Sequence, residues 1–260
     1  RIRLWGDGIA TFIERLKTEA PPLARIQNLE RHPLADNKPS GFDISDSVEG
    51  EMKITLTPDI TTCQVCLDEI RDPFHQLYRY PFANCTNCGP RFSILYAPPY
   101  DRNRTSMKAF DMCGYCEGAY RDPADRRYHA QPIACHQCGP KAWIEKLGEG
   151  VVNYEVFSML DDVDAVGGMM RSGKIVAIKG IGGFHLACDA TRHHIVVTLR
   201  QRKKRKHKPF ALMARDLDIV KEYAHVSAEE ARILSSPEGP IVLLEAKQNT
   251  NLSTAVAPGL

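Results

Sequence analysis

The order of hydrophobic and polar residues divides the 260-residue chain into three regions. In the first region, the helical spacing of Phe12, Ile13 and Leu16 predicts an amphipathic helix, which ends at the following pair of prolines. Short alternating or extended runs before and after it predict strands at residues 1–5, 24–30 and 41–45. Residues 1–50 are therefore expected to form an α+β domain.

The last region has the pattern of an α/β domain. A helix is predicted at residues 160–171, where Val163, Val166 and Met170 lie on one side, and a second helix around residues 193–202. Apolar runs predict strands at residues 175–178, 184–187 and 241–244. The first strand is expected to be buried because it is apolar throughout. We place this domain at residues 151–260 and the intervening one at 51–150.

The middle region contains an internal repeat with a period of 50 residues. Residues 63–92 and 113–142 share the pattern C-x2-C-x18-C-x2-C, an Arg-Asp-Pro triplet and a final Gly-Pro pair. The cysteines of this pattern are Cys63, Cys66, Cys85, Cys88, Cys113, Cys116, Cys135 and Cys138. Such self-similarity indicates a duplicated structural module.

Two cysteines separated by two residues direct both sulfurs toward one ion, and a set of four thiolates is typical of a structural zinc site. We therefore predict two Zn²⁺ ions, each in a closed shell that supplies folding energy rather than catalysis. Gly89 and Gly139, which follow the second pairs, are expected to adopt positive φ. Redox-active or disulfide-bonded pairs and iron–sulfur ligation are weaker alternatives. His129, His136 and Cys188 are not expected to be ligands.

The charge distribution adds a second candidate site. The net charge is only +2, yet residues 192–208 contain eight Lys or Arg residues and no acidic one. A solvated basic surface, a nucleic-acid patch and a phosphate site all fit such a run. The glycine-rich segment 180–183 after a predicted strand favours phosphate, because backbone N–H groups in such a turn bind anions.

Composition excludes several classes of protein. The sequence is 43% hydrophobic and 25% charged, which is too apolar for a disordered chain and too polar for a membrane protein. It has no run of 18 apolar residues. Four CxxC pairs favour a reducing, cytoplasmic environment. Because the chain starts at Arg1 and stops without a helix end, we expect it to be an internal part of a longer polypeptide.

These motifs together resemble the HypF carbamoyltransferase family, over nearly the whole chain. Besides the doubled cysteine pattern, the resemblance is carried by YPFANC at 80–85, NCGPRF at 87–92, PYDR at 99–102, RDPADRR at 121–127, HAQP at 129–132 and AIKGIGGFHLACDA at 177–190. The resemblance implies an α+β multidomain protein with three parts: the end of a ferredoxin-like acylphosphatase domain, a tandem zinc-finger region, and the first part of a YrdC/Sua5-like α/β domain.

The resemblance also implies an activity and its partners. Carbamoyl phosphate would be cleaved, the carbamate adenylated with ATP and Mg²⁺, and the carbamoyl group passed to the C-terminal cysteine of HypE for cyanide-ligand synthesis in [NiFe]-hydrogenase maturation. The family's K-x-R and K-P patterns fall on Lys203, Arg205 and Lys208, which would bind ATP phosphates and carbamate. Lys179, Gly180, Gly182 and Gly183 would form the adjacent wall. A zinc-containing RNA-binding module and a relative of threonylcarbamoyl-adenylate synthases are the alternatives.

Overall fold

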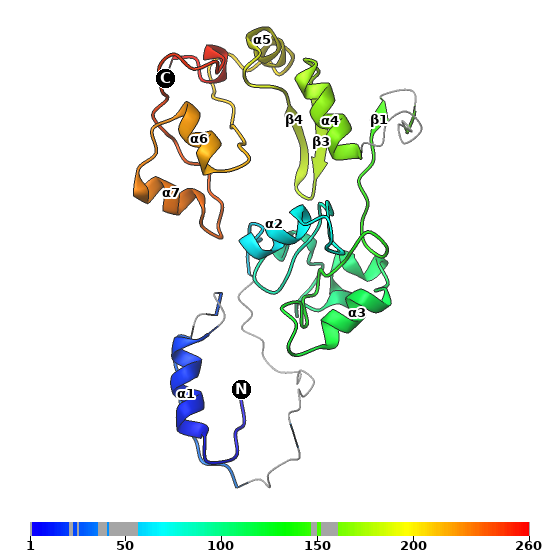
Figure 1. Cartoon of the computed structure of the whole chain (residues 1–260), viewed down its shortest axis with the longest axis vertical. Coiled ribbons are helices and arrows are strands. Elements are labelled where there is room, and N and C mark those ends of the chain that lie inside the picture. Colours follow the sequence, from blue (N-terminus) through cyan, green and yellow to red (C-terminus); the bar gives the residue numbers. More distant parts are fainter. Residues whose placement is uncertain are drawn as a thin grey trace. The chain divides into compact units, whose positions relative to one another are not determined.

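The computed structural model describes residues 2–20, 23–24, 26–35, 41, 57–146, 150–151 and 161–259. The chain forms two compact units, Arg1–Leu56 and Thr57–Leu260, which are described separately (Figure 1). The predicted strand at 41–45 lies outside the described residues, except for residue 41.

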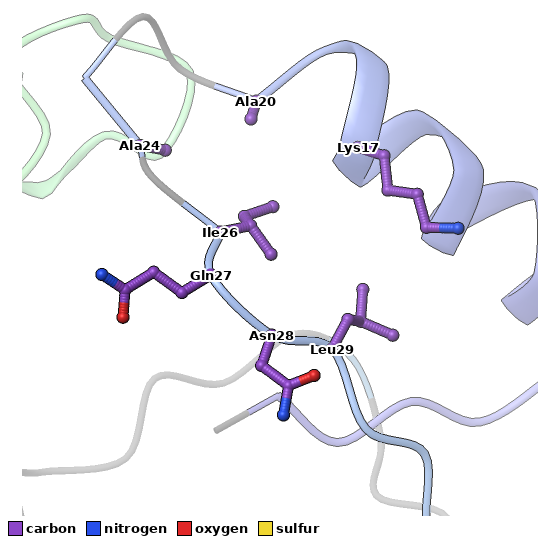
Figure 2. Close-up of a pocket in the computed structure, with 7 residues that line it drawn as sticks. All are labelled: Lys17, Ala20, Ala24, Ile26, Gln27, Asn28 and Leu29. Carbon is purple, nitrogen blue, oxygen red and sulfur yellow. The ribbon is translucent and has the colours of Figure 1, made fainter.

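The first unit contains the predicted helix as α1, Ile9–Thr18. Ile9, Ile13 and Leu16 are its less exposed side chains and recur at helical spacing. A shallow hollow lies between the end of α1 and the segment that follows, and Figure 2 shows Ile26 and Leu29 at its edge. Residues 2–5 and 26–30 are not strands, because a strand needs a ladder partner and the described residues of this unit provide none.

The second unit begins with the cysteine-rich region. Its two longer helices are α2, Gln64–Arg71, and α3, Gly114–Arg121, which start one residue after Cys63 and Cys113. Three 3-10 turns lie between them: η1, Phe92–Ile94; η2, Arg102–Arg104; and η3, Ser106–Ala109. A two-residue ladder of β1, Glu145–Lys146, and β2, Gly150–Val151, follows the second repeat.

The duplication is reproduced in the backbone. The helices α2 and α3 have the same length and start 50 residues apart. Arg79 and His129 occupy the same place in the two repeats, and both have positive φ, 59° and 52°. The main core is nevertheless shared: Leu77 and Tyr80 of the first repeat pack with Ile133 of the second.

The rest of the second unit is α/β. Its elements are α4, Asp162–Arg171; β3, Val176–Gly180; β4, Gly183–Ala187; α5, His193–Arg202; α6, Leu217–Tyr223; α7, Ala228–Leu234; and the 3-10 turn η4, Thr254–Val256. Strands β3 and β4 form an antiparallel hairpin, with Gly180 opposite Gly183. The predicted helices and the first two predicted strands of this region are therefore present.

Two expectations for this region are wrong. Strand β3 is not buried, since Ile178 is 42% exposed, because the hairpin has no further strand beside it among the described residues. Residues 241–244 do not form a strand, and Ile241 is 83% exposed. Apolar side chains give a segment the tendency to pair, but pairing itself requires a neighbouring strand with free backbone groups.

Among the described residues, polar contacts at two places connect the cysteine-rich and α/β regions. Arg79 donates to the carboxylate of Asp161 at 2.8 Å and lies 2.9 Å from Asp164. Asp161 is also the N-cap of α4, since it accepts from the backbone N–H of Asp164. At the second place, the backbone N–H of Thr61 donates to the carbonyl of Pro237 at 3.0 Å.

Candidate metal centres

The first cluster joins Cys63 and Cys66, at the start of helix α2, to Cys85 and Cys88 in a later turn. All four sulfurs lie within 4.8 Å of one another, and three of the cysteines are buried. The sulfurs of Cys85 and Cys88 are 3.8 Å apart, and those of Cys66 and Cys88 are 3.5 Å apart. Cys63 is the N-cap of α2, and Cys66 lies in its first turn, so the helix directs both sulfurs to the same side.

The second cluster repeats this arrangement with Cys113, Cys116, Cys135 and Cys138. Its sulfur–sulfur distances are 3.6 Å for Cys113 and Cys135, and 3.5 Å for Cys116 and Cys138. It is more open than the first cluster, because both Cys113 and Cys138 are partly exposed. The eight cysteines named from the sequence are thus brought together in the two predicted sets of four.

These distances fit a tetrahedral metal site. Four thiolates at about 2.3 Å from a central Zn²⁺ lie about 3.8 Å from one another by tetrahedral geometry. A disulfide requires about 2.05 Å between sulfurs, and all nine cysteines are free, so the disulfide alternative is wrong. Burial, followed by the neighbouring Cys138 sulfur, raises the pKa of the Cys116 thiol. Four sulfurs at this spacing fit the ligand shell of a single metal ion.

The glycines after the second cysteine pairs serve different purposes. Gly89 has φ of +99°, as expected for the turn. Gly139 is outside the left-handed region, so the expectation of positive φ is wrong there. A Cβ atom at Gly139 would lie 2.1 Å from the Tyr80 hydroxyl and 2.5 Å from the Cβ of Ala134. At this position, glycine permits a close approach between the repeats.

The two histidines near the second cluster have other partners. The Nε2 atom of His136 lies 2.8 Å from the carbonyl oxygen of Tyr78, and its ring contacts Tyr80 edge-on. The His129 ring stacks on Tyr120 at 5.0 Å between centroids. Cys188 lies apart from both clusters, and burial raises the pKa of its thiol. None of these three residues belongs to a four-cysteine cluster in the described part of the chain.

Sequence reasoning missed a pair of arginines that link the repeats. Arg126 of the second repeat reaches the first cluster, where its Nη2 atom lies 3.1 Å from the Cys66 sulfur. Glu69 on α2 pairs with both Arg126 and Arg127. A signal was present in the alignment of the repeats, since the residue equivalent to Arg126 in the first repeat is Gln76.

The basic run does not form one uniform surface. Arg200 is buried, and its guanidinium donates to the carbonyls of Arg205, Lys208 and Val256 at 2.8–3.1 Å. It therefore organises the basic loop, residues 203–208, instead of facing solvent. Lys203 and Lys208 are exposed.

Arg205 is half-buried, and part of its guanidinium is used within the loop. It donates to the carbonyl of Lys208 at 3.2 Å and to that of Pro209 at 2.7 Å. Its guanidinium carbon also lies 5.4 Å from the centre of the Phe210 ring. The orientation of Arg205 is thus fixed by the loop.

The structure separates the glycine-rich turn from the basic loop. Residues 180–183 are the turn of the β3–β4 hairpin, and Lys179 lies beside it with its ammonium 5.9 Å from the Phe184 ring. Helix α5 follows the opposite, open end of the hairpin, as Figure 1 shows. Lys203, Arg205 and Lys208 are therefore grouped together, whereas Lys179, Gly180, Gly182 and Gly183 form a second group.

Comparisons with known proteins agree with both parts of this description. A family model described as "HypF finger" matches residues 62–95 and 112–145, the two cysteine repeats. The Sua5/YciO/YrdC model, described as "Telomere recombination", matches residues 168–260. The chain thus combines a tandem finger region with a YrdC-type α/β region.

Over its whole length the chain is similar to part of the HypF carbamoyltransferases. It is 45% identical over 260 residues to "Carbamoyltransferase HypF" of Rhodobacter capsulatus and 41% identical over 254 residues to that of a Synechocystis strain. These alignments cover 100% and 96% of the chain, but only 34% and 32% of the relatives. The chain therefore spans about a third of the length of the curated relatives it matches.

Solved structures give the same result. A crystal structure of full-length HypF in its phosphate- and nucleotide-bound form matches with a TM-score of 0.86 and 45% identity, over 96% of this chain and 32% of that one. The structure of T. kodakarensis HypF matches with a TM-score of 0.77 and 44% identity, over 97% and 31%. Within the described part of the chain, no helix has the length and apolar character needed to cross a membrane.

Proposed function

We propose that each four-cysteine cluster holds one structural Zn²⁺. The ligands are Cys63, Cys66, Cys85 and Cys88 in the first site, and Cys113, Cys116, Cys135 and Cys138 in the second. Sulfur–sulfur distances of 3.5–3.8 Å support this assignment, as does the match to a finger family. Four thiolates fill a tetrahedral shell, so the ions stabilise the fold and leave no position for substrate.

We propose that the chain is part of a carbamoyltransferase. The observation that carries this proposal is 45% identity over the whole chain to a protein named for that activity. Carbamate released from carbamoyl phosphate attacks the α-phosphorus of Mg²⁺-bound ATP, which gives carbamoyl-adenylate and releases pyrophosphate. A thiolate at the C-terminal cysteine of HypE then takes the carbamoyl group, and AMP leaves. The reaction serves cyanide-ligand synthesis in the cytoplasm.

The three regions are assigned accordingly. Residues 1–50 are the C-terminal part of an acylphosphatase-like domain, residues 51–150 the tandem finger region, and residues 151–260 the N-terminal part of a YrdC/Sua5-like domain. The family matches at 62–95, 112–145 and 168–260 support the second and third assignments. Helix α1 is the element that supports the first.

The proposed anion pocket contains Lys203, Arg205 and Lys208. Fixed cations stabilise the negative charge that develops during adenylyl transfer, and a guanidinium binds phosphate through two hydrogen bonds at once. Arg205 is oriented by the carbonyls of Lys208 and Pro209, and buried Arg200 holds the loop that bears all three. Lys179, Gly180, Gly182 and Gly183, in the turn of the β3–β4 hairpin, are a second group of proposed substrate contacts, apart from this loop.

The test is ATP–pyrophosphate exchange that depends on carbamoyl phosphate, measured in the full-length protein. Lys203→Ala and Arg205→Ala should each lower the exchange rate by about tenfold or more. Lys221→Ala is the matched control, because Lys221 is an exposed lysine on α6 that lies 3.9 Å from Asp218. Exchange that survives both pocket substitutions would show that the pocket is wrongly placed, while absence of exchange in the unmodified protein would refute the carbamoyltransferase proposal.

A further inference from the structure

We infer that the guanidinium of Arg126 is a hydrogen-bond donor to the first metal site, and that it makes the two sites chemically unequal. Reagents that attack thiolates should therefore remove the metal from the second site before they remove it from the first site. This inference rests on the proposal that both clusters hold zinc. It concerns the reactivity of the sites rather than carbamoyl transfer.

Arg126 is held in place by contacts on both sides. Its carbonyl oxygen accepts from the backbone N–H of Thr86 at 3.3 Å and from the Thr86 hydroxyl at 3.0 Å. Thr86 directly follows the ligand Cys85. The Nε atom of Arg126 donates to Glu69 at 3.1 Å, and Nη2 lies between that carboxylate and the Cys66 sulfur. The Arg126 side chain is only 26% exposed.

The second site has no equivalent donor among the residues that the structure describes. The repeat places Gln76 at the position of Arg126. Arg102 lies near the second site, but its guanidinium donates to the carbonyls of Phe110, Gln131 and Ile133. The second site is also more open, with two partly exposed cysteines against one in the first site.

The chemical consequence follows from charge. A Zn²⁺ ion with four thiolates has a net charge of −2, which leaves electron density on sulfur. An N–H donor with a positive charge withdraws part of that density and makes the sulfur a weaker nucleophile. Partners outside the ligand shell commonly change metal affinity by about 10- to 100-fold.

Iodoacetamide provides a direct probe. A thiolate lone pair attacks the methylene carbon, a carbon–sulfur bond forms, and iodide leaves with the electrons of the broken carbon–iodine bond. The resulting thioether is a poor zinc ligand, so the ion is released and is measured with a coloured chelator. Mass spectrometry of the alkylated peptides identifies which cysteines have reacted.

In the unmodified chain loaded with two Zn²⁺, we expect two phases of release. Cysteines of the second site should be alkylated first, and those of the first site about tenfold more slowly. Arg126→Gln should speed the slow phase by about tenfold and leave the fast phase unchanged. Arg121→Gln is the matched control, because Arg121 is a 75% exposed arginine that pairs with Glu117 on α3.

Cobalt gives a second measurement that does not depend on release. In the Co²⁺-loaded chain, Arg126→Gln should shift the thiolate-to-cobalt absorption of one of the two ions to longer wavelength. Arg126→Lys, which keeps a cation, should give intermediate release and absorption and covers the case in which the glutamine variant does not fold.

Several results would overturn the inference. A first site that is alkylated as fast as the second in the unmodified chain would do so. Equal rates of the slow phase in the Arg126→Gln and Arg121→Gln variants would also overturn it. If both variants still bind two Zn²⁺ ions, the zinc proposal is unaffected by that result. A chain that binds no metal at residues 63–88 would refute the zinc proposal and the inference together.

Discussion

Gly139 is the position where one added methyl group should most damage the second metal site. Its Cβ would lie 2.1 Å from the Tyr80 hydroxyl and 2.5 Å from the Cβ of Ala134. Tyr80 is only 2% exposed, and its hydroxyl donates to the carbonyl of Pro140 at 3.2 Å. Neither neighbour is the end of a flexible side chain, so Gly139→Ala must displace the core that the two repeats share.

The size of the effect follows from two contributions. Forcing a methyl group into a filled core costs about 1–3 kcal/mol. Displacement of the Tyr80 hydroxyl adds about 1 kcal/mol for its lost hydrogen bond. The sum is about 2–4 kcal/mol, and folding of such a module is coupled to metal binding. We therefore expect Gly139→Ala to weaken metal binding at the second site by about 30-fold or more, since about 1.4 kcal/mol corresponds to tenfold.

Competition titration with a chelator of known affinity, in the Co²⁺-loaded chain, measures this change. Gly118→Ala is the matched control in the same repeat, because nothing lies within 4 Å of its added Cβ. That variant should bind as the unmodified chain does. Adding Tyr80→Phe to Gly139→Ala removes the closer of the two obstacles and should restore part of the lost affinity.

Two results would refute this reasoning. The first is a Gly139→Ala chain that binds both ions with unchanged affinity, which would mean that the core yields without cost. The second is equal weakening by Gly118→Ala, which would point to backbone freedom rather than to the contacts of Gly139.

Three further predictions concern other parts of the second unit. Removal of both zinc ions should abolish amide-exchange protection in α2 and α3 while α5 keeps its protection, measured by hydrogen-exchange mass spectrometry. Arg200→Leu should remove its hydrogen bonds to the carbonyls of Arg205, Lys208 and Val256, lower the free energy of unfolding by about 3 kcal/mol, and expose the basic loop to limited proteolysis. The hydrogen bond from Arg79 holds the pKa of Asp161 below its ordinary value of 3.8. This pair therefore stabilises the fold above that value, and its contribution is lost as the pH falls through the lowered pKa. Arg79→Gln should raise the Asp161 pKa, measured by carboxyl NMR titration.

The metal sites could be predicted from the sequence because their determinants are local. Two residues between cysteines fix the geometry of each pair, and the 50-residue repeat identifies which pairs belong together. The α5 helix was predicted with its observed bounds, His193–Arg202. Residues 241–244 were wrongly predicted to form a strand, because an apolar run shows a tendency to pair but does not supply a partner.

The contacts that sequence analysis missed are long-range. Arg126 meets Cys66 across 60 positions of sequence, and Arg200 meets Val256 across 56. Nothing in either local pattern distinguishes a buried, structural arginine from a solvated one. The basic run therefore left three interpretations open, and none of them predicted that Arg200 organises the loop from within.

The shared core of the two repeats also bears on how this region arose and how it can be divided. Tyr80 and Leu77 of the first repeat pack against Ile133 of the second, so the larger of the two core clusters belongs to both copies. The two repeats are therefore not independently folded modules. A single ancestral copy would have had to close its core in another way, for example by self-association, before duplication joined two copies in one chain. Cutting the chain between α2 and α3 would divide this shared core between two fragments.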